Sequence, residues 1–373
     1  MEKDLEGFID FFKKVPDHRV ERKKLHLVEE ILLLTFCATV AGCDGWEDIE
    51  LFGKTKIDML REYLPYKNGI PSDDTLRRFF RVLEPEKFEG CFIAWVKSFQ
   101  QKLDTRNIAI DGKESRHSFD GENKAMHMIS AFASESSIVL GQLNVDGKSN
   151  EITAIPQLLD LLDVAGSTIT IDAMGCQTKV VEKIIEKNAH YVLGLKGNQS
   201  TLHDNVQLLF KHKPKNMVFS SCVENDKGHG RVERRKCTVS DDIDWLKMEH
   251  PHWKNLKSIV EIESTRETKK EISVEKRYYI SDHAANPELI SDAVRQHWGI
   301  ENKLHWVLDM SFGDDQSRIR KGNAPRNMAI VKKTVLNLLQ MVKKDMKRIS
   351  LKRMRKLAGW DNQFLNTVLM AKF

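Results

Sequence analysis

The spacing of apolar residues divides the chain into a helical first part and a longer part that alternates strands with helices. Up to about residue 100, apolar residues recur at three- and four-residue steps, as in "WEDIELFGKTKIDMLREYL" (46–64), which is typical of amphipathic helices. In "IPSDDTLRRFFRVL" (70–83), Ser72 stands directly before two acidic residues, a pattern that predicts the start of a helix. We therefore expect residues 1–100 to form an all-helical N-terminal region.

From about residue 105 the pattern becomes one of short apolar runs. "NIAIDG", "AMHMISAFAS" and "SIVLGQLNV" are rich in β-branched residues and are separated by turn-forming residues, which predicts three strands. A helix (150–165), a strand (167–175), a helix (176–188) and a strand (189–198) follow. The runs IAI, ITI and YVLGL show little polar alternation, so we expect an α/β core whose sheet is covered on both faces.

Further along, the pattern changes twice more. Segments within 211–284 alternate polar and apolar residues, which favours a separate, half-exposed antiparallel unit. Helices are expected over 288–309 and near 324–345, and "KKDMKRISLKRMRK" (343–356) carries eight Lys and Arg residues. The predicted regions are therefore 1–100 (helical), 101–210 (first part of the core), 211–284 (β-rich insertion), 285–345 (C-terminal helices of the core) and 346–373 (basic tail).

Composition narrows the possible classes of protein. With 41% hydrophobic and 30% charged residues, the chain has the composition of a globular protein rather than a disordered one. The net charge of +5 permits a polyanionic partner without requiring one. The longest apolar run, Ile31 to Gly42, is too short for a membrane span, and the acidic N-terminus lacks the apolar segment of a secretory signal. We expect a cytoplasmic protein with no membrane partner.

Three acidic residues stand in three separate predicted elements. Asp111 lies on the first strand, Asp172 ends the fourth, and Glu301 lies in the last long helix. The first strand can lie beside the fourth in a sheet of this order, and a helix across them can bring the third carboxylate to the same place. Clustered carboxylates are ligands that Mg²⁺ and Mn²⁺ prefer. Two such ions support phosphoryl transfer, so this pattern predicts a metal site for chemistry on a phosphodiester.

Basic and polar residues near these acids are candidates for contact with nucleic-acid phosphates. A turn is the alternative role for each strand-end Asp when it is considered alone. His297, Glu301 and His305 also share a helix face and could instead bind Zn²⁺. Trp298 and Trp306 are expected in the core. The predicted DNA-binding residues are Lys113, Arg116, Lys196, Asn198, Arg231, His297 and Lys303.

Several long stretches resemble one known family. "IAIDGK", "TIDAMGCQ", "YVLGLKGNQ", "GHGRVERR" and "HWGIENKLHWVLDMSFGDDQSRIRKGNAP" are similar to DDE transposases of bacterial insertion sequences, and more narrowly to H-repeat-associated transposases. The resemblance runs from about residue 9 to about residue 345. Many relatives carry Tyr, Arg and Lys seven before, four before and seven after the catalytic Glu, whereas this chain has Val294, His297 and Leu308.

The resemblance implies a ribonuclease H-like core with Asp111, Asp172 and Glu301 as catalytic and metal-binding residues. It implies Mg²⁺- or Mn²⁺-dependent cleavage at the ends of a mobile element, followed by strand transfer into target DNA. The expected partners are double-stranded DNA with terminal inverted repeats, target DNA, and a second copy of the chain in a homodimeric synaptic complex. The protein would then associate with the nucleoid when bound to DNA. Glu114 would add negative charge near the metal.

Three other functions fit the same residues. The first is a ribonuclease H-like nuclease without strand transfer, and the second is a domesticated DNA-binding protein with idle carboxylates. The third is a Zn²⁺ hydrolase built on His297, Glu301 and His305.

Overall fold

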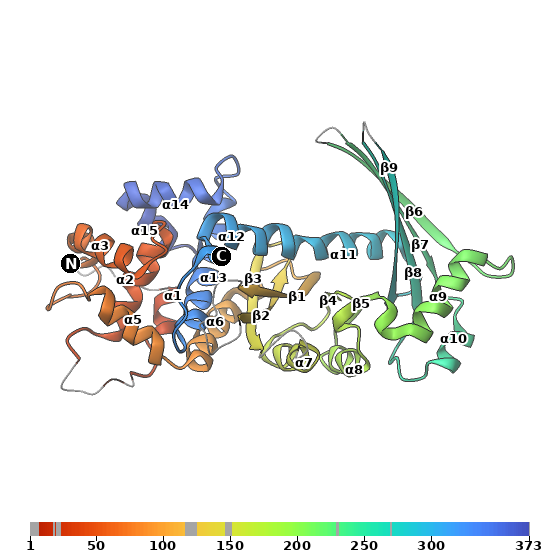
Figure 1. The fold of residues 1–373 in the computed structure, drawn as a ribbon, viewed down its shortest axis with the longest axis horizontal. Helices are drawn as coiled ribbons and strands as arrows, with labels where there is room; N and C mark the ends of the chain where they lie inside the picture. The colour runs from red at the N-terminus through yellow and green to blue at the C-terminus, as the bar shows by residue number, and fades with distance from the viewer. Residues whose placement is uncertain are drawn as a thin grey trace.

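A computed structural model describes residues 7–372 apart from 18, 20–23, 116–124, 146–150, 229–230 and 269–270. The molecule is elongated, with the N-terminal helices at one end, the strands of the core in the middle and the insertion at the other end (Figure 1). The N-terminal helices are α1 (Phe8–Phe12), α2 (Val28–Val40), α3 (Trp46–Thr55), α4 (Ile57–Leu60), α5 (Asp73–Val82) and α6 (Pro85–Gln100).

The expected helical N-terminal region is confirmed. Helix α5 begins as the sequence predicts, because the Ser72 hydroxyl accepts a hydrogen bond from the Thr75 N–H and two acids follow in the first turn. Helix α2 is apolar on all sides, since it lies at the centre of this helical region and almost all its residues are buried. Its neighbours in space are α1, α3, α13, α14 and α15.

The core contains five strands and the two helices that connect its parallel strands. The strands are β1 (Asn107–Ser115), β2 (Met126–Ala133), β3 (Ile138–Val145), β4 (Thr168–Ile171) and β5 (His190–Leu195). The connecting helices are α7 (Glu151–Leu161) and α8 (Thr178–Glu186).

These strands have the order β3-β2-β1-β4-β5. Strand β2 runs antiparallel to its two neighbours β1 and β3, while β4 and β5 run parallel to β1. This is the mixed α/β, ribonuclease H-like arrangement expected from the sequence. Every residue of β4 is buried, because helices cover both faces of the sheet at this point.

The insertion is built from four long strands that extend the same sheet. They are β6 (Ser220–Gly228), β7 (Arg231–Ser240), β8 (Ser258–Glu267) and β9 (Ile272–Ser281), and the whole sheet has the order β3-β2-β1-β4-β5-β9-β8-β7-β6. The expectation of a separate β unit is therefore wrong. Residues 192–195 of β5 pair with residues 278–281 of β9, which joins the insertion to the core sheet. The sequence could not predict this pairing, because alternation of polar and apolar residues indicates a half-exposed strand but not the sheet edge with which that strand pairs. Helices α9 (Ser200–His212) and α10 (Asp244–Glu249) accompany the insertion.

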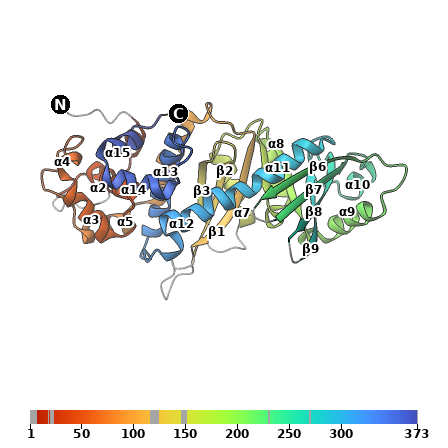
Figure 2. The ribbon, with the colours of Figure 1, turned by 90° about the horizontal axis from the view of Figure 1, so that it is seen from above.

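The last part of the chain returns across the sheet to the N-terminal helices. Helix α11 (Pro287–Gly299) crosses β1, β4 and β5 on the face opposite α7 and α8 (Figures 1 and 2). It continues through a π-helical turn, η5 (Ile300–His305), into α12 (Trp306–Phe312). Helices α13 (Ala324–Lys343), α14 (Leu351–Trp360) and α15 (Asn362–Leu369) follow.

Residues 346–373 do not form the basic tail that the sequence predicts. Helices α14 and α15 pack on α2, and their apolar residues join the main hydrophobic core. Arg355, expected in an exposed basic stretch, is 3% exposed. The apolar residues at every third or fourth position of these helices outweigh the charge of the segment. Within the described residues, no helix combines the length and the apolar character needed to traverse a bilayer.

Candidate active site

The strand register places the first two acids side by side. Strand β1 pairs in parallel with β4, with Ile110 opposite Ile171, so Asp111 and Asp172 each occupy the next position along neighbouring strands. Adjacent strands lie about 4.8 Å apart. The Asp172 carboxylate also accepts hydrogen bonds from the N–H groups of Met174 (3.0 Å) and Gly175 (3.3 Å), and so caps the short helix η3 (Ala173–Gly175). These bonds fix the position of the second acid.

The third acid comes from the helix that crosses the sheet. Glu301 lies in η5, where the hydrogen bonding widens from α-helical to π-helical, and this turn packs on β1. Short π-helical turns within α-helices occur frequently at functional sites. The main-chain geometry that presents Glu301 therefore differs from the regular helix that its sequence predicts.

Asp111, Asp172 and Glu301 line one cavity of about 490 Å³. Lys196, His297 and His305 line it as well. The cavity is bounded by the ends of β1, β4 and β5, by β9 and by α11 with η5. The three predicted acids thus share one cavity with two of the residues that were expected to contact DNA.

Crowding of carboxylates perturbs the ionisation of Asp111. Burial, followed by the negative charges of Asp172, Glu151 and Glu301, raises the pKa of its carboxyl to about 7, although the hydrogen bond from the Gly112 N–H acts in the opposite direction. A cation among these oxygens would relieve the repulsion and favour the ionised form. Oxygen donors of this kind suit a hard divalent cation, so the residues present fit the Mg²⁺ or Mn²⁺ that the sequence resemblance implies.

Two histidines flank the acids in their neutral form. The His297 ring shares a hydrogen bond with the Thr170 hydroxyl (3.1 Å), and burial lowers its pKa despite the nearby charge of Asp172. The His305 Nδ1 lies 3.7 Å from the Asp111 carboxylate, and burial and then the charges of Lys333 and Lys113 lower the pKa of His305 to about 3. Neither ring brings a positive charge to the acids at neutral pH.

The zinc site that was considered for His297, Glu301 and His305 does not assemble. Among the described residues, ligand atoms of three His, Cys, Asp or Glu residues lie within 4.8 Å of one another only at His190, Asp282 and His283. The π-helical turn changes the spacing on which the shared helix face was predicted. By the same measure the ligand oxygens of Asp111, Asp172 and Glu301 do not all lie within 4.8 Å of one another.

Asn198 and Gly194 position the site, a function that sequence reasoning did not give them. The Asn198 side-chain amide donates to the Ala173 carbonyl (2.7 Å), which ties the turn after β5 to the turn that holds Asp172. A Cβ atom on Gly194 would lie 3.1 Å from the Ala173 nitrogen and 3.4 Å from the Asp172 carbonyl carbon. The backbone that carries Asp172 therefore packs directly against β5. In the sequence, the Gly within the strand "VLGLKGN" was the feature that could have indicated this close approach.

The predicted phosphate-binding cations have different surroundings. Lys196 is exposed and lines the cavity, as expected. The Lys113 ammonium forms ion pairs with Asp309 (2.7 Å) and Asp315 (3.3 Å), so a contact with DNA, which stays a prediction, would have to replace these pairs. Both acids follow Glu301 closely in the chain, and the fold brings them to β1. Arg116 lies outside the described residues.

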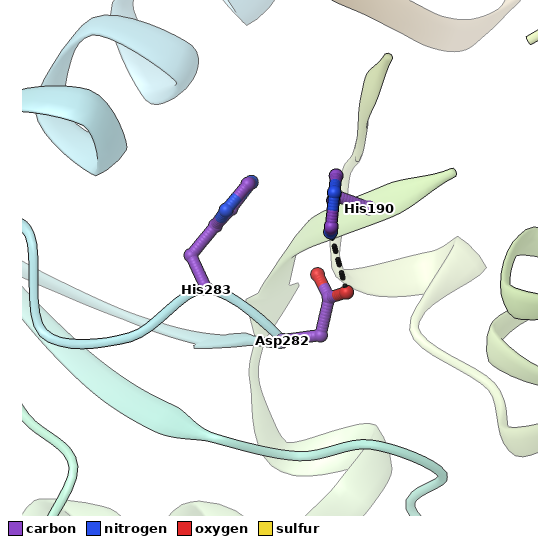
Figure 3. Close-up of side chains that lie close together, drawn as sticks. All are labelled: His190, Asp282 and His283. Atoms are coloured by element: carbon purple, nitrogen blue, oxygen red, sulfur yellow. Dashed lines mark hydrogen bonds and ion pairs between the residues drawn. The ribbon is translucent and has the colours of Figure 1, made fainter. Parts of the chain in front are cut away.

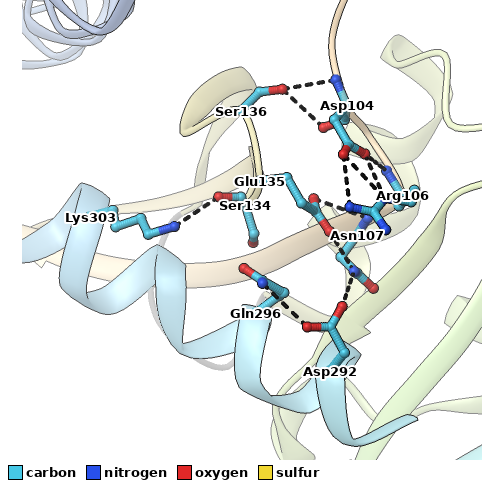
Figure 4. Close-up of polar contacts among 9 residues, drawn as sticks. All are labelled: Asp104, Arg106, Asn107, Ser134, Glu135, Ser136, Asp292, Gln296 and Lys303. Atoms are coloured by element: carbon cyan, nitrogen blue, oxygen red, sulfur yellow. Dashed lines mark hydrogen bonds and ion pairs between the residues drawn. The ribbon is translucent and has the colours of Figure 1, made fainter. Parts of the chain in front are cut away.

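Lys303 and Arg231 lie apart from the acids. The Lys303 ammonium donates to the Ser134 carbonyl (3.1 Å) at the turn between β2 and β3, as Figure 4 shows. Arg231 pairs with Glu233 (2.7 Å) at the start of β7. Both line a second cavity of about 640 Å³ between α11 and the insertion. Glu114, expected near the metal, alternates with Asp111 along β1, and strand geometry therefore directs it to the opposite face.

The second cavity continues the first along α11. The two share the lining residues Glu275, Arg277, Tyr279, Val294 and Trp298. The indole of Trp298 is 40% exposed and packs against the Arg277 guanidinium, 4.7 Å from the ring centroid, and Trp306 is 59% exposed. The prediction that these indoles lie in the core is therefore wrong. Further basic residues of this cavity are Arg235, Arg266 and Arg295.

Comparison with known proteins places the chain in a family. The family model described as "Transposase DDE domain" matches residues 102–338, and one described as "DDE_Tnp_1-associated" matches residues 9–96. YhhI of Escherichia coli K12, an H repeat-associated candidate transposase, is 40% identical over 98% of each chain. The chain belongs to the H repeat-associated family of DDE transposases. The acids Asp111, Asp172 and Glu301 all lie within the matched DDE domain.

Two further similarities accompany this match. The candidate transposase YncI of Escherichia coli O157:H7 is 42% identical to this transposase over 98% of this chain and 95% of its own length. Among solved structures, a piggyBac transposase in a synaptic complex with hairpin DNA aligns with 97% of this chain and 77% of its own, at 11% identity and a TM-score of 0.45.

Proposed function

We propose that this transposase cleaves DNA at the ends of an insertion sequence and joins the freed 3′-hydroxyl to target DNA. The observation that carries the proposal is the placement of Asp111, Asp172 and Glu301, from three separate elements, around one cavity lined also by Lys196. Membership of the DDE transposase family agrees with this chemistry.

The acids would hold one or two Mg²⁺ or Mn²⁺ ions, which when bound activate the attacking hydroxyl or water and stabilise the leaving oxygen. The protein's own residues perform the other tasks. The N–H groups of Met174 and Gly175 orient the Asp172 carboxylate, and the Lys196 ammonium is available to a DNA phosphate. The neutral His297 ring shares its hydrogen bond with the Thr170 hydroxyl, so the carboxylate oxygens of the acids would be available to the metal.

DNA would run along α11, past the acids and into the cavity that the insertion covers. The exposed side chains of this second cavity include Arg231, Arg295 and Lys303, which suit backbone contacts that do not depend on sequence. Several of these arginines already pair with acids, for example Arg295 with Glu224 at 2.9 Å, and DNA binding would exchange these pairs for phosphate contacts. The expected DNA partners are the terminal inverted repeats and a target duplex, joined by two copies of the chain in one synaptic complex in the cytoplasm.

The test is cleavage of a plasmid that carries the element with its flanking inverted repeats, with Mg²⁺ or Mn²⁺ present. Asp111→Asn, Asp172→Asn and Glu301→Gln should each abolish nicking at the repeat ends while DNA binding persists. Asp163→Asn, an exposed acid outside the cavity, is the matched control and should nick normally.

The reaction products separate the alternatives. Joining of the freed end to target DNA supports transposition, and cleavage without joining identifies a nuclease. DNA binding without cleavage by the natural chain would identify a protein with idle carboxylates and would contradict the proposal.

A further inference from the structure

A second cluster of metal-binding side chains lies at the other end of the sheet from the acids. His190 is the first residue of β5, and Asp282 and His283 connect β9 to α11 (Figure 3). The first residue of the neighbouring strand β4 is Thr168, four positions before Asp172. At about 3.3 Å per residue, the cluster lies roughly 13 Å from Asp172. The two groups of side chains are therefore independent.

The three side chains converge from two segments distant in sequence. One ligand atom of each residue lies within 4.8 Å of the others. The Asp282 carboxylate shares a hydrogen bond with the His190 Nδ1 (2.8 Å), and the two imidazole rings face each other with centroids 4.6 Å apart (Figure 3). Asp282 is 3% exposed, whereas the His190 side chain is 43% exposed, so one side of the cluster is open to solvent.

From this geometry we infer that His190, Asp282 and His283 form a Zn²⁺-binding site. Two imidazoles and one carboxylate are a common ligand set for Zn²⁺, with water completing the tetrahedron. Nitrogen donors favour Zn²⁺ over Mg²⁺, which prefers oxygen alone. Zn²⁺ would replace the proton that Asp282 and His190 share.

Neighbouring groups orient the proposed ligands. The His283 Nε2 lies 3.0 Å from the Thr168 hydroxyl, and donation from Nε2 to this oxygen leaves the Nδ1 lone pair for the metal. The second oxygen of the Asp282 carboxylate accepts the Tyr191 N–H (2.7 Å). The Ser258 hydroxyl donates to the His283 carbonyl (2.8 Å) and so fixes the backbone of this connection. Supporting hydrogen bonds of this kind commonly contribute about 10- to 100-fold to metal affinity.

Binding of Zn²⁺ would link β5 to the start of α11. Asp282 and His283 lie in the short connection that leads into α11, the helix that continues into the turn with Glu301. A metal at this point would fix where the helix enters the core. Because it lies outside the cavity of the acids, we expect it to stabilise the fold without taking part in DNA cleavage.

The test is a calorimetric titration of Zn²⁺ into the full-length Asp111→Asn/Asp172→Asn/Glu301→Gln variant, which lacks the acidic site. We expect one Zn²⁺ per chain with a Kd on the order of 1 μM or below and a higher Tm in the presence of Zn²⁺. His190→Gln and His283→Gln should each weaken binding at least tenfold and remove the rise in Tm. Thr168→Val should weaken binding by about tenfold.

His252→Gln, an exposed histidine outside the cluster, is the matched control and should bind Zn²⁺ as the parent does. Circular dichroism without metal checks that the variants fold. If the triple variant does not fold, the natural chain in excess Mg²⁺ replaces it as parent. Saturation of the site with Co²⁺ should give the intense visible absorption of a tetrahedral centre. The inference is overturned if the parent shows no saturable Zn²⁺ binding, or if His190→Gln/His283→Gln binds Zn²⁺ as tightly as the parent.

Discussion

Arg355 holds the C-terminal helices to the rest of the protein, and its replacement by Met should destabilise the fold. Its guanidinium donates to the Thr39 carbonyl from two nitrogens (3.1 and 2.9 Å) and also to the Ser311 carbonyl. It pairs with Asp44 at 2.7 Å and stacks over the Phe312 ring, 4.3 Å from the centroid. One side chain of α14 therefore joins α2, α12 and the loop that follows α2.

The size of the effect follows from what Met leaves behind. Met retains most of the apolar stem, so the lost energy is mainly that of the polar contacts. Breaking a buried charged network from one side costs about 3–5 kcal/mol. The Asp44 side chain is 43% exposed, so the ion pair with Asp44 contributes little to the free energy of unfolding. The Thr39 carbonyl still accepts a hydrogen bond from the Gly42 N–H (3.2 Å) when Arg355 is replaced, and so is not left without a partner. We therefore expect about 2–3 kcal/mol of destabilisation, at or below the lower end of that range.

Arg353→Met is the matched control, because Arg353 lies two residues earlier on the same helix and is exposed. Its effect should stay within about 0.5 kcal/mol. Thermal unfolding followed by circular dichroism should show a fall in Tm of about 3 °C for Arg355→Met and almost none for the control. Equal Tm values for the two variants would refute the assignment of Arg355 as a buried tie.

Two further substitutions test particular contacts. Gly194→Ala should lower kcat for cleavage by about tenfold with little change in KM for DNA, because the new Cβ pushes on the backbone of Ala173 and Asp172 and small displacements of catalytic groups are costly. Gly90→Ala, on α6 with open space around it, is its control, and equal kcat values for the two variants would contradict the role of Gly194. Burial raises the pKa of Glu89 to about 8, so this group should make the protein less stable as the pH rises from about 4.5 to 8. Glu89→Gln should flatten that decline in chemical-denaturation midpoints, and an unchanged pH dependence would show that Glu89 is ionised in the folded protein.

The positions of the acids could be predicted because they follow from strand order alone. Asp111 lies within β1 and Asp172 directly follows β4, a strand of the same direction, and the parallel pairing of these two strands makes the acids neighbours. Glu301 lies on the helix that follows the insertion, and a helix of that length must cross the sheet to bury its apolar side. Local sequence patterns therefore predicted the three acids at the centre of the site and the helical N-terminal region.

The remaining features depend on contacts between distant segments, which local patterns do not specify. Lys113 is paired with Asp309 and Asp315, and no spacing rule links a strand to acids almost 200 positions later. The insertion extends the core sheet because β9 meets the free edge of β5. His190 and Asp282, 92 positions apart, meet for the same reason. The density of Lys and Arg residues led to the prediction of a basic tail, whereas Arg355 of this segment is buried in the structure.

The central claim is that Asp111, Asp172 and Glu301 together bind catalytic metal, and a Mn²⁺ titration followed by electron paramagnetic resonance tests it most directly. The titration uses the full chain with His190→Gln and His283→Gln, so that the second cluster contributes nothing. We expect saturable Mn²⁺ binding that Asp111→Asn, Asp172→Asn or Glu301→Gln each weakens at least tenfold, while Asp163→Asn leaves it unchanged. Mn²⁺ binding that survives all three substitutions would contradict the account.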